Sequence, residues 1–165
     1  MELYASPDMG EENVFGKLAE DHDQIGDLFA DLEGTEDPAE RAELFHTLQQ
    51  RLMLHRRIEE EAFYPAVRRD GAVPQVERAL EEHAVVGELL DEIAYIDPAD
   101  EIFMAKISQL KTAFFHHVHE EEEQLFESAR RLLGDDELTQ LSSEVNQSRG
   151  FLRHKLGDVS LGDTL

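Results

Sequence analysis

A histidine stands four residues before a glutamate in two segments of the chain, His55 with Glu59 and His117 with Glu121. On an α-helix, residues four apart lie on the same face, about 6 Å from each other along the axis. Imidazole nitrogens and carboxylate oxygens are ligands that iron, zinc and manganese accept. Each pair therefore predicts a place where one metal ion, or one pair of ions, is held between helices.

The spacing of neighbouring apolar residues indicates that both pairs face the protein core. Each histidine continues an apolar stripe at helical spacing, and His22 and His83 interrupt similar stripes in two further segments. A buried carboxylate without a partner costs several kcal/mol, so two of them in one small core require cations nearby. The candidate metal ligands are therefore His22, His55, Glu59, His83, His117 and Glu121.

Each of these residues also has a purely structural interpretation. A lone histidine at a core position is more often hydrogen-bonded than metal-bound, and a glutamate four residues after a histidine is common on solvated helix faces. Only the repeated combination of four inward histidines and two inward glutamates favours a metal site. We expect Tyr64 and Phe126 to be packing residues. Four other acidic residues are expected at the surface, namely Glu60, Glu61, Glu120 and Glu123. Four other histidines are expected at the surface or beside the site, namely His46, His116, His119 and His154.

The elements that must position these residues are helices. Apolar residues recur at helical spacing in four long segments, and glycine, proline and aspartate fall between them. Short connections favour antiparallel neighbours. The sequence therefore predicts an all-α fold, an up-down-up-down four-helix bundle with a short additional C-terminal helix. The four expected helices run from about Glu12 to Glu33, Pro38 to Gly71, Pro74 to Ile93 and Pro98 to Leu133.

Local signals predict where the helices begin, bend and end. Aspartate followed by proline predicts helix starts at Asp37 and at Asp97, because aspartate caps a helix and proline fits its first turn. Pro65 should bend the second helix just beyond its glutamate. We expect a single domain, with the bundle in residues 1–134 and a C-terminal helical extension and tail in residues 135–165. The extension is predicted to be helical to about Lys155, with a frayed end.

The chain also contains an internal repeat. DHDQIGDLFADL, which starts at Asp21, aligns with EHAVVGELLDEI, which starts at Glu82. The segments that start at His55 and His117 share three glutamates, an aromatic residue and a closing arginine pair. Two similar helix pairs predict a pseudo-two-fold arrangement around the candidate site.

Composition excludes several classes of function. The absence of cysteine rules out disulfides, thiolate zinc sites, cysteine nucleophiles and cysteine-held iron–sulfur clusters. The chain has 38 acidic and 15 basic residues, and the net charge of −23 repels phosphate backbones, so no nucleic acid partner is expected. The first residues lack the features of a secretory signal, and no segment approaches the roughly 20 apolar residues of a membrane span. We therefore expect a cytoplasmic protein without a membrane partner.

The motifs resemble those of the hemerythrin-like family, also called HHE cation-binding domains. They comprise an acidic residue followed by histidine at Asp21 and at Glu82, and the two segments with histidine and glutamate four apart, within about residues 12–133. The family fold is an up-down four-helix bundle. The resemblance implies two iron ions in an oxo- or hydroxo-bridged, non-haem centre, where zinc or manganese can substitute for iron.

The resemblance also implies a division of the ligands between the two irons. Glu59 and Glu121 would bridge the ions, and Glu122 is an alternative to Glu121. Each ion would be held by one histidine pair, His22 with His55 and His83 with His117.

One departure from the oxygen carrier hemerythrin bears on function. That protein has a second histidine in its third helix where this chain has Gly87, and Gly26 follows His22 at the same spacing. We expect each glycine to leave an open coordination position, which favours chemistry with dioxygen, peroxide or nitric oxide over oxygen storage. The alternatives are an iron or redox sensor, or an iron reservoir, whose metal occupancy an unidentified protein partner reads, and a non-catalytic or metal-free helical module.

Overall fold

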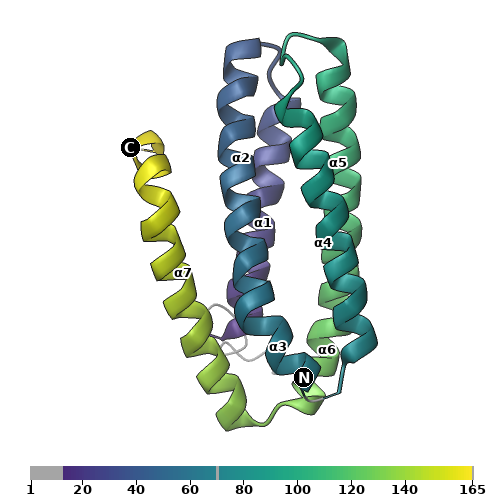
Figure 1. Ribbon diagram of the computed structural model, residues 1–165, viewed down its shortest axis with the longest axis vertical. Coiled ribbons are helices and arrows are strands. Elements are labelled where there is room, and N and C mark those ends of the chain that lie inside the picture. Colours follow the sequence, from purple (N-terminus) through teal and green to yellow (C-terminus); the bar gives the residue numbers. More distant parts are fainter. Residues whose placement is uncertain (1–12, 70, 165) are drawn as a thin grey trace.

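Four long helices alternate in direction and form a bundle, as predicted (Figure 1). The computed structural model describes residues 13–69 and 71–164, and side-chain burial within residues 13–150. The predicted helix start at Glu12 lies outside the described residues. None of the described helices is long and apolar enough to cross a membrane. The elements are α1 (Val14–Glu33), α2 (Pro38–Ile58), η2 (Glu59–Phe63), α3 (Tyr64–Arg69), α4 (Val73–Ala94), α5 (Glu101–Glu120), η3 (Glu121–Leu125), α6 (Phe126–Leu132) and α7 (Asp135–Thr164).

Aspartate side chains cap two of the bundle helices. Asp37 accepts a hydrogen bond from the backbone N–H two residues later at 3.2 Å, which confirms the predicted start of α2. The start predicted at Asp97 is wrong. The backbone N–H of Asp100 donates to the carbonyl of Asp97 at 2.8 Å, so the chain completes a turn there before the helix begins. Asp100 then caps α5 through its side chain at 3.1 Å.

The second and fourth bundle helices each contain a π-helical turn that begins at an inward glutamate. The backbone N–H of Tyr64 donates to the carbonyl of Glu59, and that of Phe126 to the carbonyl of Glu121, five residues back instead of four. The first of these turns ends two residues before Pro65, where the sequence predicted a bend, and α3 leaves the axis of α2 there (Figure 1). The second turn has no proline. The repeated glutamate-rich segments are therefore the feature that both turns share, and π turns concentrate at functional sites.

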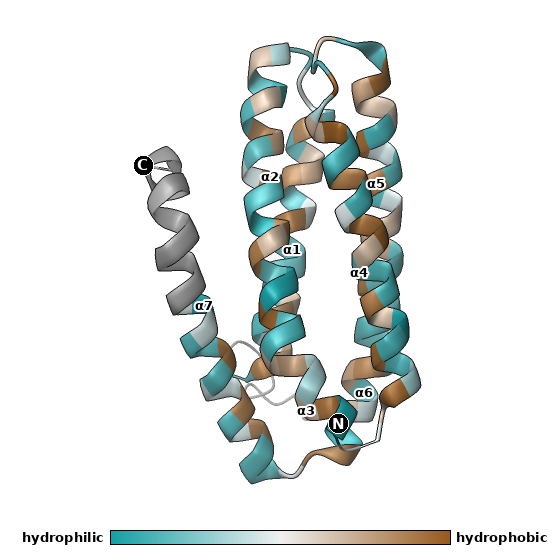
Figure 2. Ribbon diagram, viewed as in Figure 1, coloured by the Kyte–Doolittle hydropathy of each residue, from teal (hydrophilic) through white to brown (hydrophobic). Residues whose placement is uncertain are grey.

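The apolar core consists of two clusters that are separated by a layer of polar residues. Hydrophilic and hydrophobic residues alternate along each bundle helix in Figure 2. On α1, for example, His22 lies between Leu18 of the first cluster and Ile25 of the second. Each of the other three predicted histidines has the same position on its own helix, between residues of the two clusters. The polar layer is thus enclosed by apolar side chains at both ends.

The C-terminal extension is longer than the sequence predicted. α7 has 30 residues and continues past the predicted end at about Lys155. Its glycines each cost roughly 1 kcal/mol relative to alanine, which weakens a helix without ending it. Leu141 and Val145 are buried in the first apolar cluster. α7 therefore lies against α1, α2 and η2, on the side of the bundle away from α4 and α5 (Figure 1).

Candidate metal centre

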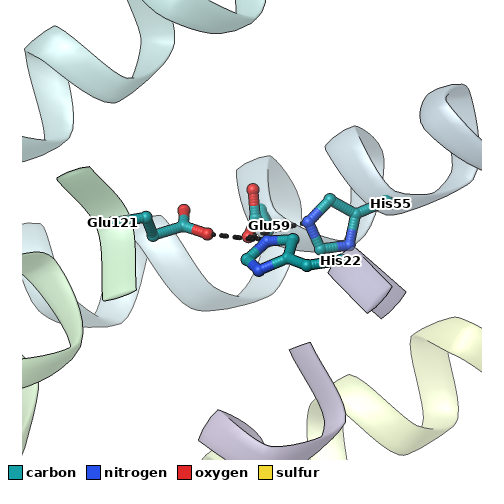
Figure 3. A group of neighbouring side chains, drawn as sticks. All are labelled: His22, His55, Glu59 and Glu121. Carbon is teal, nitrogen blue, oxygen red and sulfur yellow. Dashed lines mark ion pairs between the residues drawn. The ribbon is translucent and has the colours of Figure 1, made fainter. Parts of the chain in front are cut away.

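The polar layer contains all six predicted ligands. α1 and α4 each supply one histidine, while α2 with η2 and α5 with η3 each supply a histidine and a glutamate. The six residues are between 0% and 3% exposed. Figure 3 shows four of them converging, His22, His55, Glu59 and Glu121. The structure therefore brings together every residue that the sequence spacing selected.

The layer has a first half, with His22 and His55, and a second half, with His83 and His117. Each of the two glutamates directs one oxygen to each half. Oε2 of Glu59 lies 3.0 Å from Nε2 of His55, and Oε1 of Glu59 lies 3.0 Å from Nε2 of His83. Oε1 of Glu121 lies 3.1 Å from Nε2 of His22, and its other oxygen faces the opposite half. The two histidine rings of each half are 4.7 Å apart. This arrangement can hold two cations side by side, each facing two imidazoles and two carboxylate oxygens.

Four buried atoms of the layer that could bind a metal ion form no hydrogen bond and meet one another only in ion pairs of 3.0, 3.1 and 3.6 Å, and they test whether metal ions fit. They are Nε2 of His22 and of His55, Oε2 of Glu59 and Oε1 of Glu121. A buried polar atom without a partner costs about 1–3 kcal/mol, so such atoms are rare. One ligand atom from each of these four residues lies within 4.8 Å of the others, and the same holds for a second group, Glu59, His83 and His117. Nitrogen and oxygen donors in this arrangement suit iron, zinc or manganese.

Acidic residues that precede the histidines in sequence hold the outer nitrogens of two site histidines. Nδ1 of His55 is 3.2 Å from Oδ2 of Asp21, which comes from α1. Nδ1 of His117 is 2.9 Å from Oε1 of Glu82, which comes from α4. A carboxylate in this position fixes the tautomer and the ring orientation, so that Nε2 is free to bind a metal. Each acidic residue therefore orients the histidine of the neighbouring helix.

The outer nitrogens of the other two site histidines contact acidic residues that directly follow the inward glutamates in sequence. Nδ1 of His22 is 2.7 Å from Oε2 of Glu122, and Nδ1 of His83 is 2.7 Å from Oε2 of Glu60. The prediction that Glu60 belongs to the surface is therefore wrong, although its side chain is 35% exposed. Glu122, considered above as an alternative bridge, approaches its histidine from outside the layer, while Glu121 points inward. The internal repeat extends to these partners.

The charges in the layer shift the pKa values of its groups. Burial opposes the charged form of His55, but Glu59 and Asp21 outweigh burial and raise its pKa to about 9. Burial also lowers the pKa of His117, but the charge of Glu121, with help from other carboxylates, outweighs burial and raises the pKa to about 10. Burial would raise the pKa of Glu59, yet the neighbouring histidines hold it well below its usual range. Protons on histidine therefore balance the carboxylates in the metal-free protein, and a metal ion must displace them.

Tyr64 is a site residue that the sequence reasoning missed. Its hydroxyl lies 2.9 Å from Oε1 of Glu59, beside Oε2 of Glu121 and 3.2 Å from Nε2 of His83. In an α-helix the fourth residue after Glu59 would lie above it, but the π turn gives that place to the fifth residue, Tyr64. Burial and the two glutamate charges raise the pKa of Tyr64 well above its usual value. Phe126, at the matching place in the repeat, is buried and has no hydroxyl, so the two halves differ.

The space beside Gly26 and beside Gly87 is filled by side chains of other helices. A Cβ atom at Gly26 would lie 3.3 Å from Cζ of Phe115, and one at Gly87 would lie 3.0 Å from Nη1 of Arg56. Neighbouring helices therefore fill both spaces with a ring and a guanidinium. A histidine at Gly87 would first have to displace Arg56. That each ion keeps an open coordination position stays a prediction.

A small cavity between α4 and η3 extends from the surface to the second half of the layer. Its volume of about 10 Å³ has room for one water-sized molecule. His117 and Glu121 line the cavity together with Arg78 and Glu120. Arg78 is half-exposed and forms an ion pair of 3.1 Å with Glu120. The cavity is therefore a short polar route to the buried carboxylate and imidazole.

Three comparisons relate this chain to known proteins. The sequence model of the hemerythrin HHE cation binding domain matches residues 13–129. A crystal structure of a hemerythrin HHE cation binding domain-containing protein from Mycobacterium kansasii matches with a TM-score of 0.78 and 26% identity, covering 87% of this chain and 88% of that chain. A DNA nickase from Nostoc sp. is 27% identical over 155 residues, which are 94% of this chain and 44% of that protein. The chain thus spans less than half the length of this curated relative.

Proposed function

Because the chain belongs to the hemerythrin HHE cation-binding domain family, we propose that its buried cluster holds two iron ions and reacts with dioxygen, peroxide or nitric oxide. The observation that carries this proposal is the set of four buried donor atoms that face one another without hydrogen-bond partners. Two are nitrogens and two are oxygens, a donor set that suits iron and that also accepts zinc or manganese as substitutes.

The residues of the layer would divide between the two ions as its geometry suggests. One histidine pair would hold each ion, and both glutamates would contribute one oxygen to each. Bound iron would supply redox chemistry and coordination positions for a small ligand. The protein contributes carboxylates that keep Nε2 of every histidine directed inward, and apolar clusters that exclude bulk water. The proposed ligands are His22 and His55 for the first ion, His83 and His117 for the second, and Glu59 and Glu121 for both.

The size of the cavity supports a small reactant. A volume of about 10 Å³ admits a molecule the size of water and excludes larger organic substrates. Dioxygen, peroxide and nitric oxide, with two heavy atoms each, are the reactants closest to this size. The ion pair of Arg78 and Glu120 at the cavity gives the route polar walls, which favours hydrogen peroxide among the three.

The proposal predicts the metal content and the spectrum of the purified protein. Protein expressed with ferrous iron should carry two iron ions per chain and show the near-ultraviolet absorption of an oxo-bridged diferric centre. Addition of hydrogen peroxide to the reduced protein should restore that absorption as the centre is oxidised. Metal analysis and stopped-flow absorption measure both results. A metal-to-protein ratio near zero would contradict the proposed metal site. Two bound ions without a spectral response to any of the three reactants would contradict the proposed chemistry.

Tyr64 should act as an additional ligand to the second ion. Its oxygen lies 3.2 Å from Nε2 of His83 and 3.5 Å from Nε2 of His117, among the donors of that half, and a bound cation would replace its proton. The iron-loaded protein should therefore show a visible phenolate-to-iron(III) absorption band that Tyr64→Phe removes. Tyr95→Phe is the control, because Tyr95 is 92% exposed. A band that persists in Tyr64→Phe, or no band in the unaltered protein, would contradict this role.

Nicking of DNA is a second candidate because of the name of the curated relative. This chain spans 44% of that protein, and its net charge of −23 opposes contact with phosphate backbones. We therefore propose that the chain does not act on nucleic acid by itself. Supercoiled plasmid incubated with the iron-loaded protein should stay intact. Nicking that disappears in a Glu59→Gln variant would show the opposite.

A further inference from the structure

Arg149 links the C-terminal helix α7 to the metal layer. Its Nη2 donates a hydrogen bond of 3.0 Å to Oδ1 of Asp21, and the side chains of Arg149 and Asp21 are 15% and 13% exposed. The other oxygen of Asp21 lies 3.2 Å from Nδ1 of His55. Nε2 of the same imidazole faces the centre without a hydrogen-bond partner. Two consecutive hydrogen bonds therefore connect α7 to a candidate metal ligand.

The repeat-related half of the layer has no such link. Glu82 holds Nδ1 of His117 at 2.9 Å, but the other oxygen of Glu82 faces His116 at 3.4 Å, and that histidine is 62% exposed. Neither Glu60 nor Glu122 forms an ion pair with lysine or arginine in the described part of the chain. Among the four carboxylates that hold the site histidines, Asp21 is thus the one paired with a guanidinium within the described residues. Arg149 makes the two halves of the layer unequal.

Arg149 lies one helical turn beyond the buried residues of α7. Leu141 and Val145 are buried in the first apolar cluster, and Arg149 follows Val145 by one helical turn on the same face. The apolar residues hold the first half of α7 whether or not the site is filled. The ion pair with Asp21 then decides how firmly the helix is held at Arg149.

We propose that Arg149 is a positioning residue that couples metal binding at His22 and His55 to the docking of α7. The inference rests on the proposed metal site. Asp21 orients His55 only if Asp21 is itself held in place, and a guanidinium is well suited to hold a carboxylate. Partners of this kind change metal affinity by about 10–100-fold. Because coupling between two sites is reciprocal, the metal must also strengthen the docking of α7.

The substitution Arg149→Gln tests the first half of this coupling. Titration with zinc, which avoids iron oxidation, should show about 10-fold weaker binding of one ion and unchanged binding of the other. Arg149→Lys should restore most of the lost affinity, because lysine keeps the charge. The double variant Arg149→Gln with Asp21→Asn should bind no more weakly than Asp21→Asn alone, because Arg149 acts through Asp21. A purely structural role would give additive losses and would affect both ions.

Hydrogen exchange of α7 tests the reverse direction. In the full chain, zinc should slow amide exchange around Arg149, and this protection should be absent in Arg149→Gln. Arg68→Gln is the control, since Arg68 pairs with Glu77 on the surface, with both side chains about half-exposed and without contact to a site histidine. If two ions bind normally to Arg149→Gln and zinc leaves exchange of α7 unchanged, the coupling is wrong and the metal site stands. If the unaltered protein binds no metal, the proposed function itself fails.

Discussion

Replacement of Glu59 by glutamine should weaken the binding of both metal ions by more than about 100-fold, because loss of a ligand exceeds the 10–100-fold cost of losing a partner outside the ligand shell. Glu59 is fully buried and directs one oxygen to each half of the layer. Glutamine has nearly the same shape, so the bundle should remain folded. It lacks the negative charge, so it cannot bridge two cations. Isothermal titration with zinc and metal analysis after iron loading measure the loss.

Glu61→Gln is the matched control for this experiment. Glu61 lies two residues away, is 54% exposed and pairs with Arg57 on the surface of η2. The Glu61→Gln variant should bind two ions with the affinity of the unaltered protein. The pseudo-symmetry of the layer predicts that Glu121→Gln reproduces the Glu59→Gln result. If Glu59→Gln keeps both ions at full affinity, neither the bridge nor the division of the ligands can be correct.

Metal loading should raise the thermal unfolding midpoint of the protein by about 8–16 °C for each tightly bound ion. A ligand at about 1,000 times its dissociation constant adds about 4 kcal/mol to the free energy of unfolding, if only the folded state binds it. In a chain of this size each kcal/mol shifts the midpoint by about 2–4 °C. Part of the effect comes from the four donor atoms without partners, which a bound ion would satisfy. Scanning calorimetry of zinc-loaded and chelator-treated protein measures the difference.

The same comparison on Glu59→Gln separates site binding from general effects of the metal. Zinc should shift its unfolding midpoint by no more than about 3–6 °C for each ion, because a 100-fold loss of affinity leaves about 1.4 kcal/mol of stabilisation. The metal-free variant is expected to unfold at a lower temperature than the metal-free parent, because the buried histidines lose a carboxylate that balances their charge. Each protein is therefore compared with its own metal-free form. An equal shift in both proteins would place the stabilising zinc elsewhere on this acidic surface.

The sequence alone was sufficient for the helices and for the six residues of the layer. Both depend on the α-helical period, which is local. His55 and Glu59 share a face because they are four apart, and apolar neighbours at the same period turn that face inward. The repeat added the matching pair in the second half. The expected division of the chain at residue 134 stays a prediction.

The predictions that failed depended on backbone detail or on distant neighbours. The α period places Phe63 next to Glu59 and predicts that Tyr64 is a packing residue, but the π turn shifts that place by one residue to Tyr64. Nothing in its own helix fills the space beside Gly87, but Arg56 of another helix does, and the sequence could not predict this contact. The start predicted at Asp97 overlooked a turn that delays the helix to Asp100.

Only the tertiary structure decided how the two halves of the layer differ. A local pattern cannot reveal that Arg149 reaches Asp21 across 128 positions of sequence, because that contact depends on how α7 packs on the finished bundle. Nor does it reveal that Glu60 holds His83 from a neighbouring helix. Helical periodicity determines which side chains face the core, and it can be read from the sequence because it involves residues only one turn apart. The partners that orient and distinguish those side chains come from other helices, so their identities depend on packing.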